Sequence, residues 1–316
     1  MVKGLLPVRK STNVRVFIIA IILLSLFGPC GLDPARAQVQ SPDLTLLAAE
    51  TAIREGGTLI EQGRWEEARR SFERAIAWNS NLGIAYYNLG VTLGVLGRSD
   101  EAVAAYRTAL RRQPTLVEAQ VNIGVELYKQ NRLTEALETL QAAVRKAPRH
   151  VAAQHNLGVV LSCLGRLAEA LDVLHRATAL APNDSSIQRT LADTHHNIGV
   201  EHARHRRWAA ALASYETALR FNRDLPEAWN GSGVALARTA RHDLALSMYD
   251  QALSLRPGFA AAHFNRARSL VALRRYSEAI AACQAVLDRK PSLQPAMHLL
   301  DHLRRLIAPA SRTSQS

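Results

Sequence analysis

Small residues recur at a fixed spacing of 34 positions along most of this 316-residue chain. The series runs through Gly56, Gly90, Gly124, Gly158, Gly199, Gly233 and Ala267, with one longer step of 41 before Gly199. An alanine lies 12 residues after each of them. A period of this length is typical of solenoid proteins, in which each repeat is one supersecondary unit stacked on its neighbours. The sequence therefore predicts seven repeats, which begin at Ala49, Gly83, Val117, Val151, Ala192, Pro226 and Ala260.

The second repeat shows what one unit is. Its apolar and small positions in residues 86–93 fall on one face of a helix, and those in residues 102–109 on one face of another. Gly97, between the two, suits the left-handed residue that ends many helices. Each unit is thus predicted to be a helical hairpin, and we expect Gly90 and Ala102 to be small because the two helices cross there.

These units resemble tetratricopeptide repeats (TPR), whose pattern is an aromatic residue, Leu-Gly, an aromatic residue, Ala, Phe or Tyr, Ala and Pro. The resemblance extends over residues 49–293, with a proline missing at Ser80 and Arg223 and a glycine missing at Ala267. It implies an all-α fold, a right-handed α-solenoid of seven TPR helical hairpins with a C-terminal capping helix. In that family the first helices line a concave groove that grips extended peptides.

The repeats divide the chain into segments. The predicted order is a linker at 38–48, units one to four at 49–184, an insertion at 185–191, units five to seven at 192–293, a capping helix at 294–307 and a disordered tail at 308–316. Seven residues are about two helical turns. The insertion is therefore predicted to extend the first helix of the fifth unit, and a longer loop is the alternative.

Residues 1–37 have the layout of a secretory signal peptide. Four cations precede an apolar run at 16–27, and Ala35-Arg36-Ala37 matches a cleavage site of the A-x-A type. The prediction is export, with a periplasmic or secreted mature chain that begins after Ala37. The alternative is an uncleaved membrane anchor formed by residues 16–32.

Charge is unevenly distributed in the mature chain. Removing residues 1–37 takes five cations and one anion from the total of 39 and 27, which leaves 34 minus 26, or +8. Residues 185–316 hold 18 cations and 10 anions, so this segment carries the whole excess. A one-sided basic surface favours acidic partners or anionic lipid.

No motif in the chain indicates catalysis, a metal site or a cofactor. Cys163 and Cys283 lie more than three repeats apart and belong to no C-x-x-C pair. Sequences typical of a nucleophile elbow, a phosphate-binding loop or a zinc site are missing, and the repeats leave no room for a catalytic domain. The sequence therefore predicts a protein that is not an enzyme and that needs no cofactor.

Asparagine recurs two residues before the glycine position, at Asn88, Asn122, Asn156, Asn197 and Asn265. A carboxamide both donates and accepts hydrogen bonds, so a row of them could hold a peptide backbone. The resemblance implies that the row lies in the groove, as in the repeat arrays of O-linked N-acetylglucosamine transferases. The alternative is that each asparagine bonds to a neighbouring helix.

Cations and rings accompany this row. Lys129, Arg204 and Arg238 share one repeat position, with Arg268 nearby, and Tyr87, His155, His196 and Phe264 directly precede asparagines. The predicted groove becomes more basic toward the C-terminus and suits an acidic or carboxylate-ended peptide. The carboxylate clamp known in this family requires a different set of lysines and arginines, which the chain does not contain.

An arginine follows the hairpin turn in every unit, at Arg64, Arg98, Arg132, Arg166, Arg207, Arg241 and Arg275. We expect these side chains to meet the negative ends of the first helices. A basic ridge that binds lipid or a polyanion is the alternative.

The sequence as a whole predicts an exported, non-catalytic scaffold that binds a protein or peptide segment in its groove, in the assembly of an envelope or membrane complex. The alternative is a membrane-anchored assembly platform that uses a basic convex surface. Nucleic acid is disfavoured as a partner because aromatic residues are not interleaved with the cations.

Overall fold

The computed structural model describes residues 42–289 and 291–307, and every regular element in them is a helix. The helices are α1 (Pro42–Glu61), α2 (Trp65–Trp78), α3 (Gly83–Val95), α4 (Ser99–Arg112), α5 (Val117–Lys129), α6 (Leu133–Lys146), α7 (Val151–Cys163), α8 (Leu167–Leu180), α9 (Ser185–Arg204), α10 (Trp208–Phe221), α11 (Pro226–Arg238), α12 (His242–Leu255), α13 (Ala260–Ala272), α14 (Tyr276–Leu287) and α15 (Gln294–Ile307). This confirms an all-α fold of seven hairpins and one further helix.

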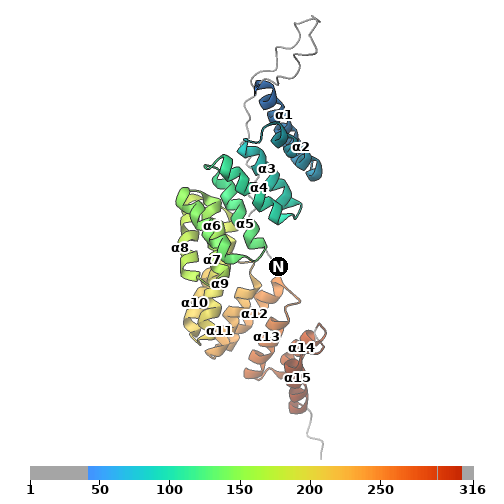
Figure 1. Cartoon of the computed structure of the whole chain (residues 1–316). Coiled ribbons are helices and arrows are strands. Elements are labelled where there is room, and N and C mark those ends of the chain that lie inside the picture. The colour runs from blue at the N-terminus through green and yellow to red at the C-terminus, as the bar shows by residue number, and fades with distance from the viewer. Residues whose placement is uncertain (1–41, 290, 308–316) are drawn as a thin grey trace, which may run out of the picture. The chain divides into compact units, whose positions relative to one another are not determined.

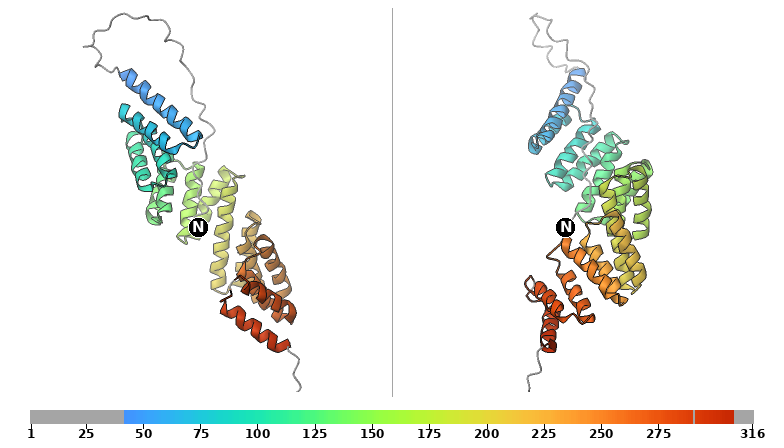
Figure 2. Two further views of the ribbon diagram at one scale, coloured as in Figure 1. Left: turned by 90° about the vertical axis from the view of Figure 1, so that its right-hand side faces the viewer. Right: turned by 180° about the vertical axis from the view of Figure 1, so that it is seen from behind.

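The helices fall into two compact units. The N-terminal unit contains α1 to α7, the C-terminal unit contains α9 to α15, and α8 contributes residues to both. Within each unit, every helix packs against the helices before and after it in the chain (Figure 1, Figure 2). Within each unit, a hairpin therefore buries its apolar stripe between its own two helices and against the next hairpin of that unit, as expected of a solenoid.

Every hairpin turns through one residue with a left-handed backbone. The turn residues are Gly63, Gly97, Asn131, Gly165, Arg206, Ala240 and Arg274, with φ from +56° to +77°. The next residue donates its backbone N–H to a carbonyl five residues earlier, as Arg98 does to Leu93 at 2.9 Å. This bond is typical of a Schellman cap. The left-handed region costs other residues roughly 1–2 kcal/mol relative to glycine, so the three turns of the C-terminal unit are strained.

The repeated glycine makes room for a side chain. A Cβ atom at Gly90 would lie 2.6 Å from Cε1 of Tyr106, and Gly199 and Gly233 face Tyr215 and Tyr249 in the same way. For Gly90, the prediction that the residue is small because two backbones meet there is therefore wrong. The second helix inserts a large side chain where the first helix has none, an aromatic ring in these hairpins and Leu140 opposite Gly124.

Two helices extend beyond the repeat frame. Residues 42–48, predicted to be linker, form the first turns of α1, where Pro42 occupies a favourable first position and no helix breaker follows. The sequence did not indicate this part of the helix, because the leucines at 44, 46 and 47 are exposed and do not form a buried apolar stripe. Residues 185–191 are helical and belong to α9, whose first turn is capped by the Asp184 carboxylate accepting from the Ser186 N–H at 2.9 Å.

The last helix closes the C-terminal unit. Leu300 and Leu303 of α15 are buried and pack in one cluster with Cys283 of α14. This is the contact expected of a capping helix, because a stack of hairpins otherwise ends in an exposed apolar face.

The predicted signal peptide or anchor and the predicted tail lie outside the described residues. Among the helices of residues 42–289 and 291–307, none combines the length and the apolar character that a membrane span requires.

Candidate functional site

Successive first helices lie next to each other within each unit. The helix α3 contacts α5 and α5 contacts α7, and in the C-terminal unit α9 contacts α11 and α11 contacts α13. Their outward side chains thus form one continuous surface in each unit, which we call the first-helix face. All the site residues predicted from the sequence belong to first helices.

In the N-terminal unit, Asn122 is a structural residue. Its side chain is 8% exposed, and its Nδ2 donates to the Tyr106 hydroxyl of the preceding hairpin at 3.3 Å. The ring of Tyr106 also lies 5.9 Å from that of Tyr87, and burial raises the pKa of the Tyr106 hydroxyl. Asn122 therefore satisfies a buried hydroxyl, which agrees with the alternative of a bond to a neighbouring helix.

His155 and Asn156 of α7 are fully buried. The Nδ2 and Oδ1 atoms of Asn156 find no hydrogen-bond partner in the described residues, an arrangement that costs about 1–3 kcal/mol. A peptide on the surface cannot reach either side chain in this conformation. The predicted row of asparagines is therefore not a continuous exposed ladder in the N-terminal unit, where only Asn88 is partly exposed.

Lys129, predicted to be a groove cation, is neutralised within the N-terminal unit. Its Nζ lies 2.7 Å from Oε1 of Glu126, whose side chain is buried. The Ser99 hydroxyl donates to the other carboxylate oxygen of Glu126 at 2.7 Å. Because Lys129 compensates this buried carboxylate, the N-terminal unit offers no excess positive charge at that position.

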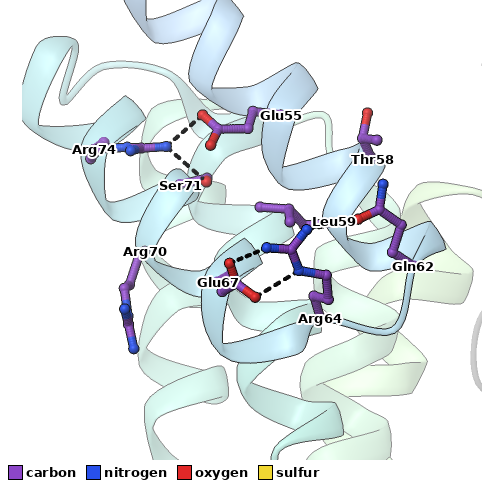
Figure 3. A pocket seen from close by; sticks show the side chains of 9 residues that line it. All are labelled: Glu55, Thr58, Leu59, Gln62, Arg64, Glu67, Arg70, Ser71 and Arg74. Carbon is purple, nitrogen blue, oxygen red and sulfur yellow. Dashed lines mark hydrogen bonds and ion pairs between the residues drawn. The ribbon is translucent and has the colours of Figure 1, made fainter.

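The first hairpin contains a cavity of about 420 Å³ that the sequence did not predict (Figure 3). Most of the charged side chains that line it bind one another. Arg64 and Glu67 form a two-pronged ion pair, and Arg74 donates to both Glu55 and Ser71. Charges that already bind each other leave little for a ligand, so we assign this cavity a structural role.

The first-helix face of the C-terminal unit begins with His196 and Asn197 of α9. His196 packs 5.6 Å from the ring of Tyr215, and its burial lowers its pKa, so the imidazole is neutral at pH 7. Asn197 and Arg204 are exposed. A partner can reach both side chains, and their role in binding stays a prediction.

The asparagine row breaks at Gly231 for a steric reason. A Cβ at Gly231 would lie 2.7 Å from Cζ of Tyr215 in the preceding hairpin. The adjacent Asn230 accepts a hydrogen bond from Asn265 Nδ2 at 3.0 Å. Asn265 is thus held in place by α11 while its side chain stays partly exposed.

A cavity of about 320 Å³ opens between α11, α12 and α13. Its polar lining consists of Arg238, His242, Tyr249, Asn265, Arg268 and Ser269. No acidic residue lines it, and both guanidinium groups lack an ion pair within the described residues. We call this site the arginine pocket.

The remaining groups of the arginine pocket are oriented by contacts with each other. Burial raises the pKa of Tyr249 to about 12, so its hydroxyl keeps its proton at pH 7. The Nδ1 atom of His242 lies 3.4 Å from the Ser269 hydroxyl. The guanidinium of Arg238 is supported by the Trp208 ring, whose centroid lies 5.7 Å from Cζ.

Only some of the predicted site residues therefore line the arginine pocket. The structure brings Arg238, Asn265 and Arg268 together and leaves the half-buried Phe264 outside the lining. Sequence reasoning missed Tyr249 and His242, which lie on a second helix. The repeat frame contained a signal for Tyr249, because this tyrosine shares the frame position of Tyr106 and Tyr215.

Many solved structures are similar to this chain, and three of them serve as examples. They are the C-terminal part of a TPR repeat-containing protein from Cytophaga hutchinsonii (18% identity, 78% of this chain and 99% of that chain, TM-score 0.61), PilF of Pseudomonas aeruginosa (21%, 71% and 99%, 0.53) and a TPR protein from Parabacteroides merdae (13%, 81% and 99%, 0.52). At such identities the likeness shows a shared fold alone. No curated protein matches the sequence significantly.

A family model supplies the assignment. The model described as tetratricopeptide repeat matches residues 53–117, 121–185, 196–258 and 240–293. These matches cover more than half of the chain and coincide with the helical hairpins of the structure. The chain therefore belongs to the tetratricopeptide repeat family.

Proposed function

We propose that this protein is a non-catalytic scaffold that captures an acidic segment of a partner protein on the first-helix face of its C-terminal unit. The observation that carries the proposal is the arginine pocket, where Arg238 and Arg268 converge without a carboxylate partner. The fold itself supports a role in binding proteins, because stacked hairpins present a long surface suited to that role.

The pocket chemistry fits a carboxylate. Guanidinium groups bind carboxylates through paired, charge-assisted hydrogen bonds. The protonated hydroxyl of Tyr249 and the amide of Asn265 add neutral donors to the same cavity. An acidic side chain of a partner would thus pair with two cations that have no carboxylate in the cavity lining.

The test uses a fluorescent peptide of glutamate and alanine with a free C-terminus, and its glutamine analogue, titrated by fluorescence anisotropy. We expect Arg268→Gln and Arg238→Gln each to weaken binding of the glutamate peptide roughly tenfold or more, since a hydrogen bond to a charged group contributes about 1.5–3 kcal/mol. The matched control is Arg220→Gln, which removes an exposed arginine whose guanidinium contacts only Thr217 within the described residues.

Two results would contradict this proposal. One is unchanged affinity in Arg268→Gln, and the other is equal binding of the glutamine peptide. Arg268→Gln is the decisive variant because Arg238 also covers Trp208, so its removal disturbs packing as well as charge.

We also propose that the protein is exported and acts in the assembly of an envelope or membrane complex. The support is the sequence of residues 1–37, with its basic start, short apolar run and A-x-A site. Mass spectrometry of the protein purified from its native cells is expected to find a chain that begins at Gln38. An intact N-terminus would favour the membrane anchor instead.

A further inference from the structure

The arginine after each hairpin turn normally has a carboxylate partner. Each of these residues is the N-cap of a second helix, and four of them bind the glutamate three residues later: Arg64 with Glu67, Arg98 with Glu101, Arg132 with Glu135 and Arg275 with Glu278. In these four hairpins the guanidinium pairs with the second helix, and in two of them it also donates to a glutamine beside the end of the first helix, from Arg64 to Gln62 and from Arg132 to Gln130. The backbone N–H of each of the seven arginines donates to a carbonyl in the last turn of the first helix.

Two hairpins of the C-terminal unit lack the glutamate. The residue three positions after Arg207 is Ala210, and the residue three positions after Arg241 is Leu244. Both arginines are exposed, and neither forms an ion pair within the described residues. The usual neutralisation is thus lost in two consecutive hairpins.

Further cations surround these two arginines. The left-handed turn residues of hairpins five and seven are Arg206 and Arg274, and Arg204 ends α9. All three are exposed and have no ion pair within the part of the chain that the structure describes. In the N-terminal unit the corresponding turn positions hold only glycine or asparagine.

The turns lie on one edge of the C-terminal unit. Each turn follows a first helix, and successive first helices lie side by side. The cation–π contact between Trp208 and Arg238 connects the turns of hairpins five and six, and the charge of Asp243 acts on Arg275 across hairpins six and seven. Of the acidic residues near this edge, Glu278 is paired, which leaves Glu201 and Asp243 against the unpaired cations.

An apolar side chain accompanies the charge. Leu244 replaces the expected glutamate and is 49% exposed beside Arg241. Guanidinium groups next to an exposed leucine suit the boundary between lipid headgroups and acyl chains. They suit single-stranded nucleic acid less well, because the nearby Trp208 is covered by Arg238 and cannot stack freely on a base.

We propose that this turn edge, formed by Arg204, Arg206, Arg207, Arg241, Leu244 and Arg274, docks onto an anionic lipid surface. The arginine pocket, whose lining contains none of these residues, would still be open to a partner protein. The proposal does not depend on the arginine pocket, because the residues of the turn edge lie outside its lining.

The test restores the missing glutamates with Ala210→Glu and Leu244→Glu in one chain. These substitutions reproduce the ion pair of four other hairpins, so the variant is expected to fold and to melt at or above the wild-type temperature. The matched control, Thr217→Glu with Gln251→Glu, adds the same charge to equivalent positions of α10 and α12 about two turns further along.

Binding is measured by co-sedimentation with phosphatidylcholine vesicles that contain or lack phosphatidylglycerol. The wild-type chain should bind the anionic vesicles more tightly, and added salt should weaken this binding. The restored-glutamate variant should bind roughly 30-fold more weakly, as expected for two neutralised arginines near a charged membrane, and the control should bind nearly as well as wild type.

Several outcomes would overturn the proposal. They are equal binding by the restored-glutamate variant and the wild type, an equal loss in the control, and equal binding to vesicles without phosphatidylglycerol. Binding of a single-stranded oligonucleotide in place of anionic vesicles would identify the edge as a nucleic-acid surface and reject the lipid surface.

Discussion

Replacing Gly56 by alanine is expected to destabilise the first hairpin by about 2 kcal/mol, while the same change at the neighbouring Gly57 is expected to stabilise it by up to about 1 kcal/mol. A Cβ at Gly56 would lie 2.6 Å from Cε1 of Phe72, whereas a Cβ at Gly57 would meet nothing within 4 Å. Both positions gain the same helix propensity, so the difference between them isolates the steric term.

The measurement is urea unfolding of both variants, with hydrogen exchange of the α1 and α2 amides to locate the effect. Phe72 is fully buried and its ring is stiff, so the structure cannot relieve the overlap by a simple rotation. If Gly56→Ala were as stable as Gly57→Ala, the packing explanation for the repeated glycine would fail.

Tyr215→Ala is expected to lower the free energy of unfolding by about 3–5 kcal/mol, as removal of a buried aromatic side chain typically does. The ring is 4% exposed and fills the space left by glycines in two successive hairpins, Gly199 and Gly231. Its removal would therefore open a cavity inside hairpin five and at its contact with hairpin six.

The matched control is Tyr215→Phe, which keeps the ring and is expected to cost less than about 1.5 kcal/mol. Hydrogen exchange should show that Tyr215→Ala uncouples α9 and α10 from α11 and α12, because a solenoid is held together by contacts between neighbours. A loss below about 1 kcal/mol would mean that the two hairpins do not depend on this ring.

The sequence located the glycine positions correctly and explained them wrongly. A period of 34 residues is visible without a structure, because a side chain is excluded at the same place in each unit. What excludes it is invisible in the period itself. A large side chain, aromatic or leucine, comes from the partner helix 16 residues later, and its direction depends on how the two helices pack.

For the asparagine row, the sequence showed the positions but not the surroundings of each side chain. The sequence placed five asparagines at one frame position, but their environments differ because their neighbours differ. Asn122 donates to a tyrosine hydroxyl, Asn265 donates to Asn230, and Asn197 is exposed beside His196. Position in the repeat predicted a shared location, and only packing decided which amide a ligand can reach.

The sequence by itself determined the seven hairpins, their order and the basic character of the C-terminal half. Each depends on local spacing or on composition, which a linear chain displays directly. The tertiary structure decided which cations are free. Lys129 is neutralised by a buried carboxylate, while Arg238 and Arg268, which lie in different hairpins, converge on one cavity. Charges interact through space, so their partners become known only when the chain is folded.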